Sequence, residues 1–112
     1  MNMIEMKNLQ KLPALKTLAP GATDAFWAFD RAALAGGAIP VKYKELMAVA
    51  VALTTQCAYC IEIHGEQARK AGASAEELAE TVLVAAALRA GAAVTHGSHL
   101  LPAADASLRD AA

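Results

Sequence analysis

Between Val41 and His64 the chain contains neither glycine nor proline, and this uninterrupted stretch limits the possible folds more than any other feature. Glycine and proline destabilise a helix more than any other residues, so the stretch favours helix along its whole length. The composition agrees, because the 112 residues include 29 alanines and only 4% aromatic residues, which is unfavourable for a β-sheet. We therefore expect an all-α protein, a small helical domain of about five to seven helices.

The stretch must contain a break if Glu45, near its start, is to contact the cysteines near its end. A continuous helix rising 1.5 Å per residue would place Glu45 about 18 Å from Cys57. Thr54-Thr55-Gln56, directly before the cysteines, has low helix propensity. We therefore place the break there and expect a second helix from Cys57 to Gly72.

Glycine and proline also divide the chain before this stretch. Pro13 interrupts the segment from Glu5 to Leu18, which is expected to form a short or broken helix. Pro20-Gly21 marks a turn, after which Ala22 to Leu34 is expected to be helical. The aromatic residues of this helix are interpreted as anchors of the core, because aromatic side chains usually bury much of their surface; they are Phe26, Trp27 and Phe29.

A capping motif marks the start of a further helix. Ser74 and Glu77 have the spacing of a capping box, so we expect a helix from Ala75 to Ala90. Gly91 is expected to end it and to leave a separate helical stretch from Ala92 to Leu101.

Length and charge indicate one domain, residues 1–112, with a peripheral segment at 1–19 and a frayed end at 103–112. The 10 basic and 11 acidic residues are spread along the chain, which gives no reason to expect a nucleic-acid partner. Charged residues among the first 16 positions argue against a signal peptide, and the unbroken apolar runs fall short of the roughly 20 residues that span a bilayer. We expect a cytoplasmic protein with no membrane segment.

Two apolar runs indicate self-association. Leu46 to Leu53 and Val82 to Leu88 leave no polar face on their helices, so both should be buried on all sides. A chain of this length has limited interior for two such helices. We therefore expect a homo-oligomer in which another subunit covers part of this surface.

The chemistry is concentrated in three residues, Cys57, Cys60 and His64. In a helix, positions i, i+3 and i+7 share one face, so two thiols and a base come within reach of one another. Unpaired N–H groups and the positive dipole end favour a thiolate at a helix start, and the thiolate is the reactive form of cysteine.

Three interpretations of these residues remain open. A cytoplasmic pair of cysteines is more often redox-active or metal-binding than a structural disulfide. A zinc site would need a fourth ligand such as His96 or His99, but no second Cys/His pair at zinc-finger spacing is present. In the third interpretation, all three are inert helix residues.

The pattern Glu45, eleven residues, then Cys57-x-x-Cys60-x-x-x-His64 resembles the alkyl hydroperoxidase D-like group of the carboxymuconolactone decarboxylase superfamily. The resemblance covers roughly residues 40 to 97. It implies an all-helical thiol peroxidase or disulfide reductase that assembles as trimers or hexamers. No metal or flavin is required, but an external thiol or protein reductant is, and a peroxiredoxin partner is possible. Tyr59 stands where some members have a second histidine of the proton relay.

The residue chemistry assigns roles that agree with this resemblance. Free cysteine, with a pKa of about 8.5, needs a nearby base, which His64 can supply. A carboxylate on the imidazole would hold its tautomer, the role expected of Glu45. Cys60 is favoured as the attacking thiol because His64 is its i+4 neighbour, and Cys57 would then resolve the intermediate as a disulfide. The reverse assignment stays open, because Cys57 is closer to the expected helix start. A lactone decarboxylase is the alternative within the superfamily, but that reaction gives no reason for paired cysteines.

Overall fold

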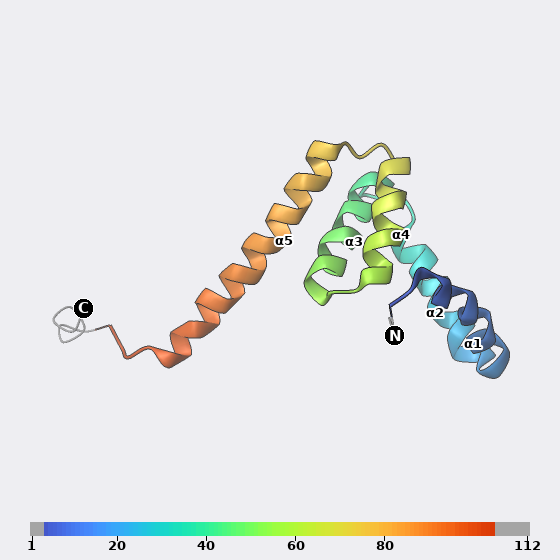
Figure 1. Ribbon diagram of the computed structural model, residues 1–112, viewed down its shortest axis with the longest axis horizontal. Coiled ribbons are helices and arrows are strands. Elements are labelled where there is room, and N and C mark those ends of the chain that lie inside the picture. Colours follow the sequence, from blue (N-terminus) through green and yellow to red (C-terminus); the bar gives the residue numbers. More distant parts are fainter. Residues whose placement is uncertain (1–3, 105–112) are drawn as a thin grey trace.

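The computed structural model describes residues 4–104, and every regular element in that range is helical (Figure 1). The elements are, in chain order, the short 3-10 helix η1 (Met6–Lys11), α1 (Leu12–Leu18), α2 (Pro20–Leu34), α3 (Val41–Thr55), α4 (Ala58–Lys70), α5 (Ala75–His96) and the 3-10 helix η2 (Gly97–Leu100). The predicted all-α fold class is confirmed. Most of the predicted frayed end, 103–112, lies outside the described residues.

Helix α3 is the centre of the fold, because it packs against both α4 and α5. The buried apolar residues are small ones at these crossings: Val49, Ala52, Ala68 and Ala85. Small side chains let helix backbones approach closely, which holds the facing residues of α3 and α4 in a fixed register. Polar residues on these two helices can therefore meet across the crossing.

The turn between α3 and α4 confirms the predicted break. Gln56 ends α3 in the left-handed conformation with φ 58°, and the Cys57 N–H donates to the Ala52 carbonyl at 3.0 Å. A left-handed residue that ends a helix in this way also satisfies the last carbonyls. Arg89 of α5 donates to the carbonyl of Thr54, so a side chain from a neighbouring helix also stabilises the turn.

The capping box that opens α5 is also confirmed. The Ser74 hydroxyl accepts from the Glu77 N–H at 3.0 Å, and the Glu77 carboxylate accepts from the Ser74 N–H at 2.9 Å. The same carboxylate lies 3.0 Å from the ammonium of Lys42 on α3. This ion pair attaches the start of α5 to the central helix.

The short or broken helix predicted for Glu5 to Leu18 is confirmed: the 3-10 helix η1 ends at Lys11, and Pro13 lies in the first turn of the seven-residue α1. Two boundary predictions are wrong. Pro20-Gly21 forms the first turn of α2 instead of a loop. A proline at a helix start loses no hydrogen bond, because that N–H has no partner within the helix. Gly91 likewise does not end α5, which continues to His96. Glycine keeps its N–H, so inside a helix it costs only about 1 kcal/mol relative to alanine.

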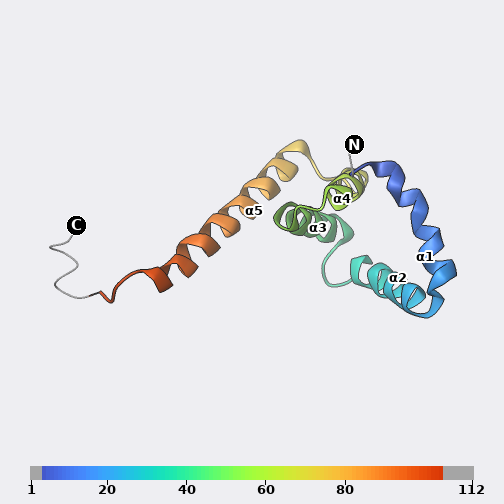
Figure 2. The same ribbon diagram turned by 60° about the horizontal axis from the view of Figure 1, so that its bottom comes forward.

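The prediction that the aromatic residues of α2 anchor the core is wrong for this single chain. Phe26 is 54% exposed and Phe29 is 69% exposed, while Trp27 contacts the edge of Phe26 with ring centroids 5.0 Å apart. The buried side chain of α2 is instead Thr23. Helices η1, α1 and α2, residues 6–34, form a hairpin beside α3 and α4 that we call the N-terminal arm (Figure 2).

The single chain is much more extended than a compact domain. Its radius of gyration is 19.9 Å, against about 13 Å expected for a compact chain of this length. Beyond Arg89, α5 projects away from the other helices (Figure 1). Both apolar runs that were predicted to be buried on all sides contain exposed residues. Met47 of the first run is 50% exposed, and Leu88 of the second run is 65% exposed. The protomer alone does not bury these runs.

One helical stretch, Ala75–Leu100, is long and apolar enough to cross a membrane by length and composition alone. The sequence argument considered only unbroken apolar runs and therefore did not register it. The stretch is almost entirely exposed in the single chain, and its N-terminal end is attached to α3 through the Lys42–Glu77 ion pair. The absence of a membrane segment remains a prediction.

Candidate functional site

The first turn of α4 carries the two cysteines. Cys57 is the N-cap residue, and its sulfur accepts a hydrogen bond from the Cys60 N–H at 3.3 Å. The Cys57 N–H donates to the Ala52 carbonyl, and the Cys57 carbonyl accepts from the Ile61 N–H at 3.0 Å. The sulfur therefore takes the place that a serine or aspartate oxygen usually occupies at a helix start.

The two thiols differ in acidity because one donates to the other. The pKa of Cys57 is lowered, first by the hydrogen bond from the Cys60 side chain and then by backbone N–H groups of Cys60 and Tyr59. The same bond raises the pKa of Cys60 to about 11, with burial and the nearby charges of Cys57 and Asp30 adding to the effect. The sequence argument favoured Cys60 as the activated thiol, whereas these hydrogen bonds favour Cys57.

We predict that Cys57 is alkylated at lower pH than Cys60 and that Cys60→Ala moves the Cys57 midpoint to higher pH. Alanine removes the donor that contributes most to the lowered pKa, while the backbone donors remain. Iodoacetamide labelling across a pH series, read by peptide mass spectrometry, measures both midpoints. Cys60→Ser is the matched control, because its hydroxyl still donates and the midpoint should move less. An unchanged midpoint in Cys60→Ala contradicts this account of the acidity.

Glu45 and His64 form the second part of the site. The Glu45 carboxylate on α3 lies 2.7 Å from Nδ1 of His64 on α4, as the sequence argument expected. The Glu45 side chain is 9% exposed, and burial of a carboxylate is costly unless it is paired. In the neutral tautomer whose Nδ1–H donates to the carboxylate, Nε2 is left as the acceptor of the ring.

The packing of α3 on α4 therefore brings all four predicted residues into one region. Cys57 and Cys60 occupy the first turn of α4, and His64 follows Cys60 by four residues on the same face. Glu45 reaches His64 from the neighbouring helix. The arrangement combines the Cys57 thiol, whose pKa is lowered, the Cys60 thiol, whose pKa is raised, and an imidazole, His64, that Glu45 holds in one orientation.

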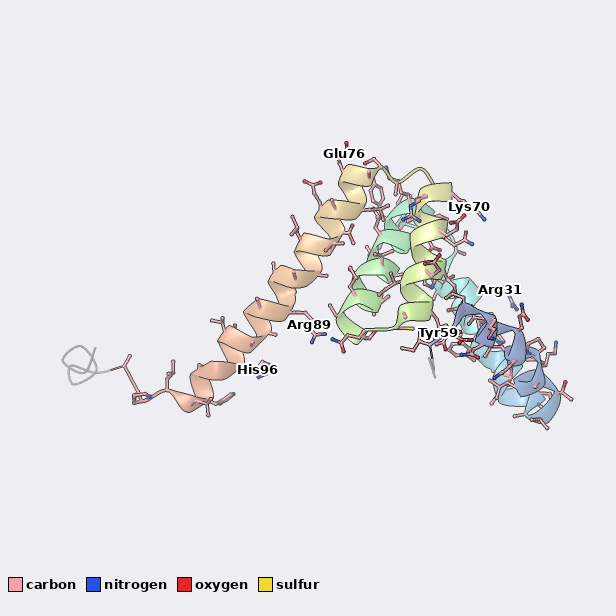
Figure 3. All side chains as sticks on the ribbon, in the orientation of Figure 1. Arg31, Tyr59, Lys70, Glu76, Arg89 and His96 are labelled. Atoms are coloured by element: carbon pink, nitrogen blue, oxygen red, sulfur yellow. The ribbon has the colours of Figure 1, made fainter. Side chains whose placement is uncertain are left out.

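Sequence reasoning missed two residues of the N-terminal arm that approach this region. The Asn8 amide of η1 donates to the Tyr59 hydroxyl at 3.0 Å, and Asp30 of α2 is close enough to act on the charge of Cys60. Figure 3 shows Tyr59 at the end of α4 nearest the arm. No local pattern indicates either contact, because the partners are far apart in sequence.

The zinc alternative has little support in the part of the chain that the structure describes. Among those residues, no group of three or more His, Cys, Asp or Glu side chains is arranged to hold a metal ion. His96 and His99, proposed as fourth ligands, lie near each other at the far end of α5, with ring centroids 6.3 Å apart. Figure 3 shows His96 on the projecting part of that helix, away from Tyr59 and the cysteine turn.

Comparison with known sequences gives one family and several relatives, among them the following two. The sequence model of the carboxymuconolactone decarboxylase family matches residues 20–103. A relative from Paracoccus denitrificans, described as uncharacterized protein 4 in the cox locus, is 46% identical over 82 residues, which are 73% of this chain and 74% of the relative. An uncharacterized protein of Cupriavidus necator is 34% identical over 93 residues, 83% of this chain and 82% of the relative.

Two solved structures are similar over most of the chain. The first is the apo form of a carboxymuconolactone decarboxylase family protein from Legionella pneumophila, with TM-score 0.70, 30% identity and 82% of each chain covered. The second is a protein from Methanobacterium thermoautotrophicum, with TM-score 0.73, 32% identity, and coverage of 79% of this chain and 99% of that one. The helical arrangement is therefore one that experimental structures also show.

Proposed function

The chain belongs to the carboxymuconolactone decarboxylase family, and from that premise we propose that it is a thiol-dependent antioxidant enzyme, an alkyl hydroperoxidase or disulfide reductase. Its redox pair is Cys57 and Cys60. The observation that carries the proposal is the hydrogen bonding at the start of α4, which lowers the pKa of Cys57 on the same helix as the paired His64.

In the first step, the Cys57 thiolate attacks the terminal oxygen of a hydroperoxide. The O–O bond breaks, the departing alkoxide takes a proton and leaves as an alcohol, and Cys57 becomes a sulfenic acid. A lowered thiol pKa favours this step because it increases the fraction present as thiolate. With a disulfide substrate, the same thiolate attacks one sulfur and releases the other as a thiol.

In the second step, Cys60 attacks the oxidised sulfur of Cys57, which forms the Cys57–Cys60 disulfide and releases water. Cys60 needs a base for this step, because a cysteine thiol is mostly protonated at neutral pH and only the thiolate attacks. His64, four residues later, is placed to take the proton through Nε2 and to pass it to the departing hydroxide. Glu45 positions the ring and holds its tautomer.

An external dithiol must return two electrons to close the cycle. We propose a small thiol or a protein reductant, with a peroxiredoxin as a candidate partner, and a cytoplasmic setting where such reductants are abundant. A lactone decarboxylase is the alternative that the family name itself suggests. The paired thiols and the Cys57 hydrogen bonds have no role in that reaction, so the redox function is preferred.

The proposal is tested by adding a hydroperoxide to the reduced protein and counting its thiols. Both thiols should be lost together, and a dithiol should restore them. Protein that keeps both thiols would not be a peroxidase of this kind.

We further propose that the working form is a homo-oligomer, a trimer or hexamer. The α3–α5 side of the protomer has a groove lined by Met47, Ala50 and Val84 among others, and Val84 is 58% exposed. The exposed apolar side chains continue along α5 to Val94, which is 78% exposed. A soluble monomer rarely leaves such a continuous apolar surface open to water. A second copy of the chain is the occupant that the extended shape suggests.

The prediction for assembly is a solution mass several times the 11.6 kDa of one chain, with Val84→Glu shifting the mass downward. A charge in a buried apolar contact is costly, whereas Gln67→Glu on the exposed side of α4 should leave the mass unchanged. Light scattering at micromolar concentration gives both answers. A monomeric wild-type protein contradicts the proposal, and an intact assembly in Val84→Glu would mean that this face is not the contact.

A further inference from the structure

The N-terminal arm is attached to the rest of the protomer mainly by polar contacts. Among its described residues only Thr23 is buried, and the Thr23 hydroxyl donates to Leu15 within the arm itself. At the end of α2, the Lys44 ammonium donates to the carbonyls of Ala33 and Ala35 at 2.9 and 2.6 Å. Within η1, the Asn8 amide donates to the Tyr59 hydroxyl of α4. Segments that bury little apolar surface open at low free-energy cost.

These contacts place the open end of the arm against the first turn of α4. Tyr59 lies between the two cysteines in sequence and is half-buried, as are Cys57 and Cys60. Asn8 belongs to η1, and Asp30, which acts on the charge of Cys60, belongs to α2, the other side of the helical hairpin. In both views the start of η1 lies next to this end of α4 (Figures 1 and 2). Two residues of the arm, Asn8 and Asp30, therefore lie beside the cysteine turn.

We propose that Asn8 and Tyr59 are specificity-determining residues of the thiol site. Their hydrogen bond holds η1 against the cysteine turn, so that small hydroperoxides reach Cys57 directly while bulky disulfides and protein reductants must first displace η1. The inference rests on the proposed function for its substrates, but the access that it describes is measurable without any turnover.

The expected effect follows from the strength of one hydrogen bond. Loss of a neutral side-chain bond shifts an opening equilibrium by about two- to tenfold. A reagent too large for the closed site reacts through the open form, so its rate should rise by that factor. A small reagent that enters the closed site should react at an unchanged rate.

The test compares two maleimides that have the same chemistry and different sizes. N-ethylmaleimide and a maleimide carrying a long polyethylene glycol chain are reacted with the full-length protein, and the rate at Cys57 is read by mass spectrometry. Asn8→Ala and Tyr59→Phe remove the bond from opposite sides, and each should raise only the rate with the bulky reagent. Because both remove one bond, the double variant should equal the single ones.

Two further variants separate the bond from general loosening of the arm. Asn8→Asp should restore slow labelling by the bulky reagent, because a carboxylate accepts from the Tyr59 hydroxyl. Gln10→Ala, at an exposed position on the same 3-10 helix, should behave as wild type. Equal acceleration of both reagents, no acceleration, or additive single effects would each overturn the inference. Absence of peroxide turnover with size selection intact would instead count against the proposed function alone.

Discussion

Replacement of either cysteine with serine is expected to reduce repeated turnover of a hydroperoxide to the uncatalysed level. A serine hydroxyl is not ionised at neutral pH and cannot form a disulfide, so the cycle stops at the step that needs the missing thiol. The serine hydroxyl still hydrogen-bonds at the N-cap position, so Cys57→Ser should keep its helical content. Peroxide consumption with excess dithiol measures the loss.

The two serine variants should differ in a single turnover. Cys60→Ser keeps the thiol of lowered pKa and should consume one equivalent of peroxide, stopping at a Cys57 sulfenic acid that dimedone traps. Cys57→Ser lacks the thiol whose pKa the hydrogen bonds at the start of α4 lower, and it should consume almost no peroxide at neutral pH. The reverse pattern would assign the first attack to Cys60, as the sequence argument did.

Breaking the Glu45–His64 pair is expected to slow formation of the disulfide by about 10²- to 10⁴-fold, the usual contribution of a positioned general base. His64→Ala removes the base itself. Glu45→Gln keeps a hydrogen-bonding side chain but lacks the charge that fixes the tautomer. In both variants the Cys57 sulfenic acid should accumulate, because the first step does not use His64. Stopped-flow peroxide addition with dimedone trapping measures each step separately.

The pair should also act as a unit. The double variant is expected to be little slower than the poorer single one, since removal of either partner already disables the base. Glu66→Gln is the matched control, because Glu66 lies on the same helix but pairs at the surface with Lys70 at 3.9 Å. Equal rates of disulfide formation in Glu45→Gln, His64→Ala and wild type would remove both residues from the mechanism.

The sequence was sufficient for features that depend on local chemistry. The capping box at Ser74 and the break at Gln56 are decided within a few residues. The Glu45–His64 contact was also predictable, because a lone buried carboxylate needs a partner and a break at Gln56 brings α4 back along α3. These predictions needed no knowledge of the rest of the chain.

Features that depend on tertiary contacts were not predictable in this way. The order of the two thiol pKa values depends on which sulfur donates to the other, and spacing alone does not decide that. Asn8 and Tyr59 are separated by 51 residues, so their bond leaves no local pattern. The exposed Phe29 was expected in the core because size and hydrophobicity do not reveal whether the covering surface belongs to the same chain.

A thiol titration of the purified protein before and after mild peroxide tests the central claim most directly. The account predicts two free thiols per reduced chain, none after oxidation, and two again after treatment with a dithiol. Metal analysis of the same sample separates this result from a structural zinc site, which would hold about one zinc per chain and oxidise slowly. A protein that keeps both thiols in peroxide, with or without bound zinc, would contradict the account.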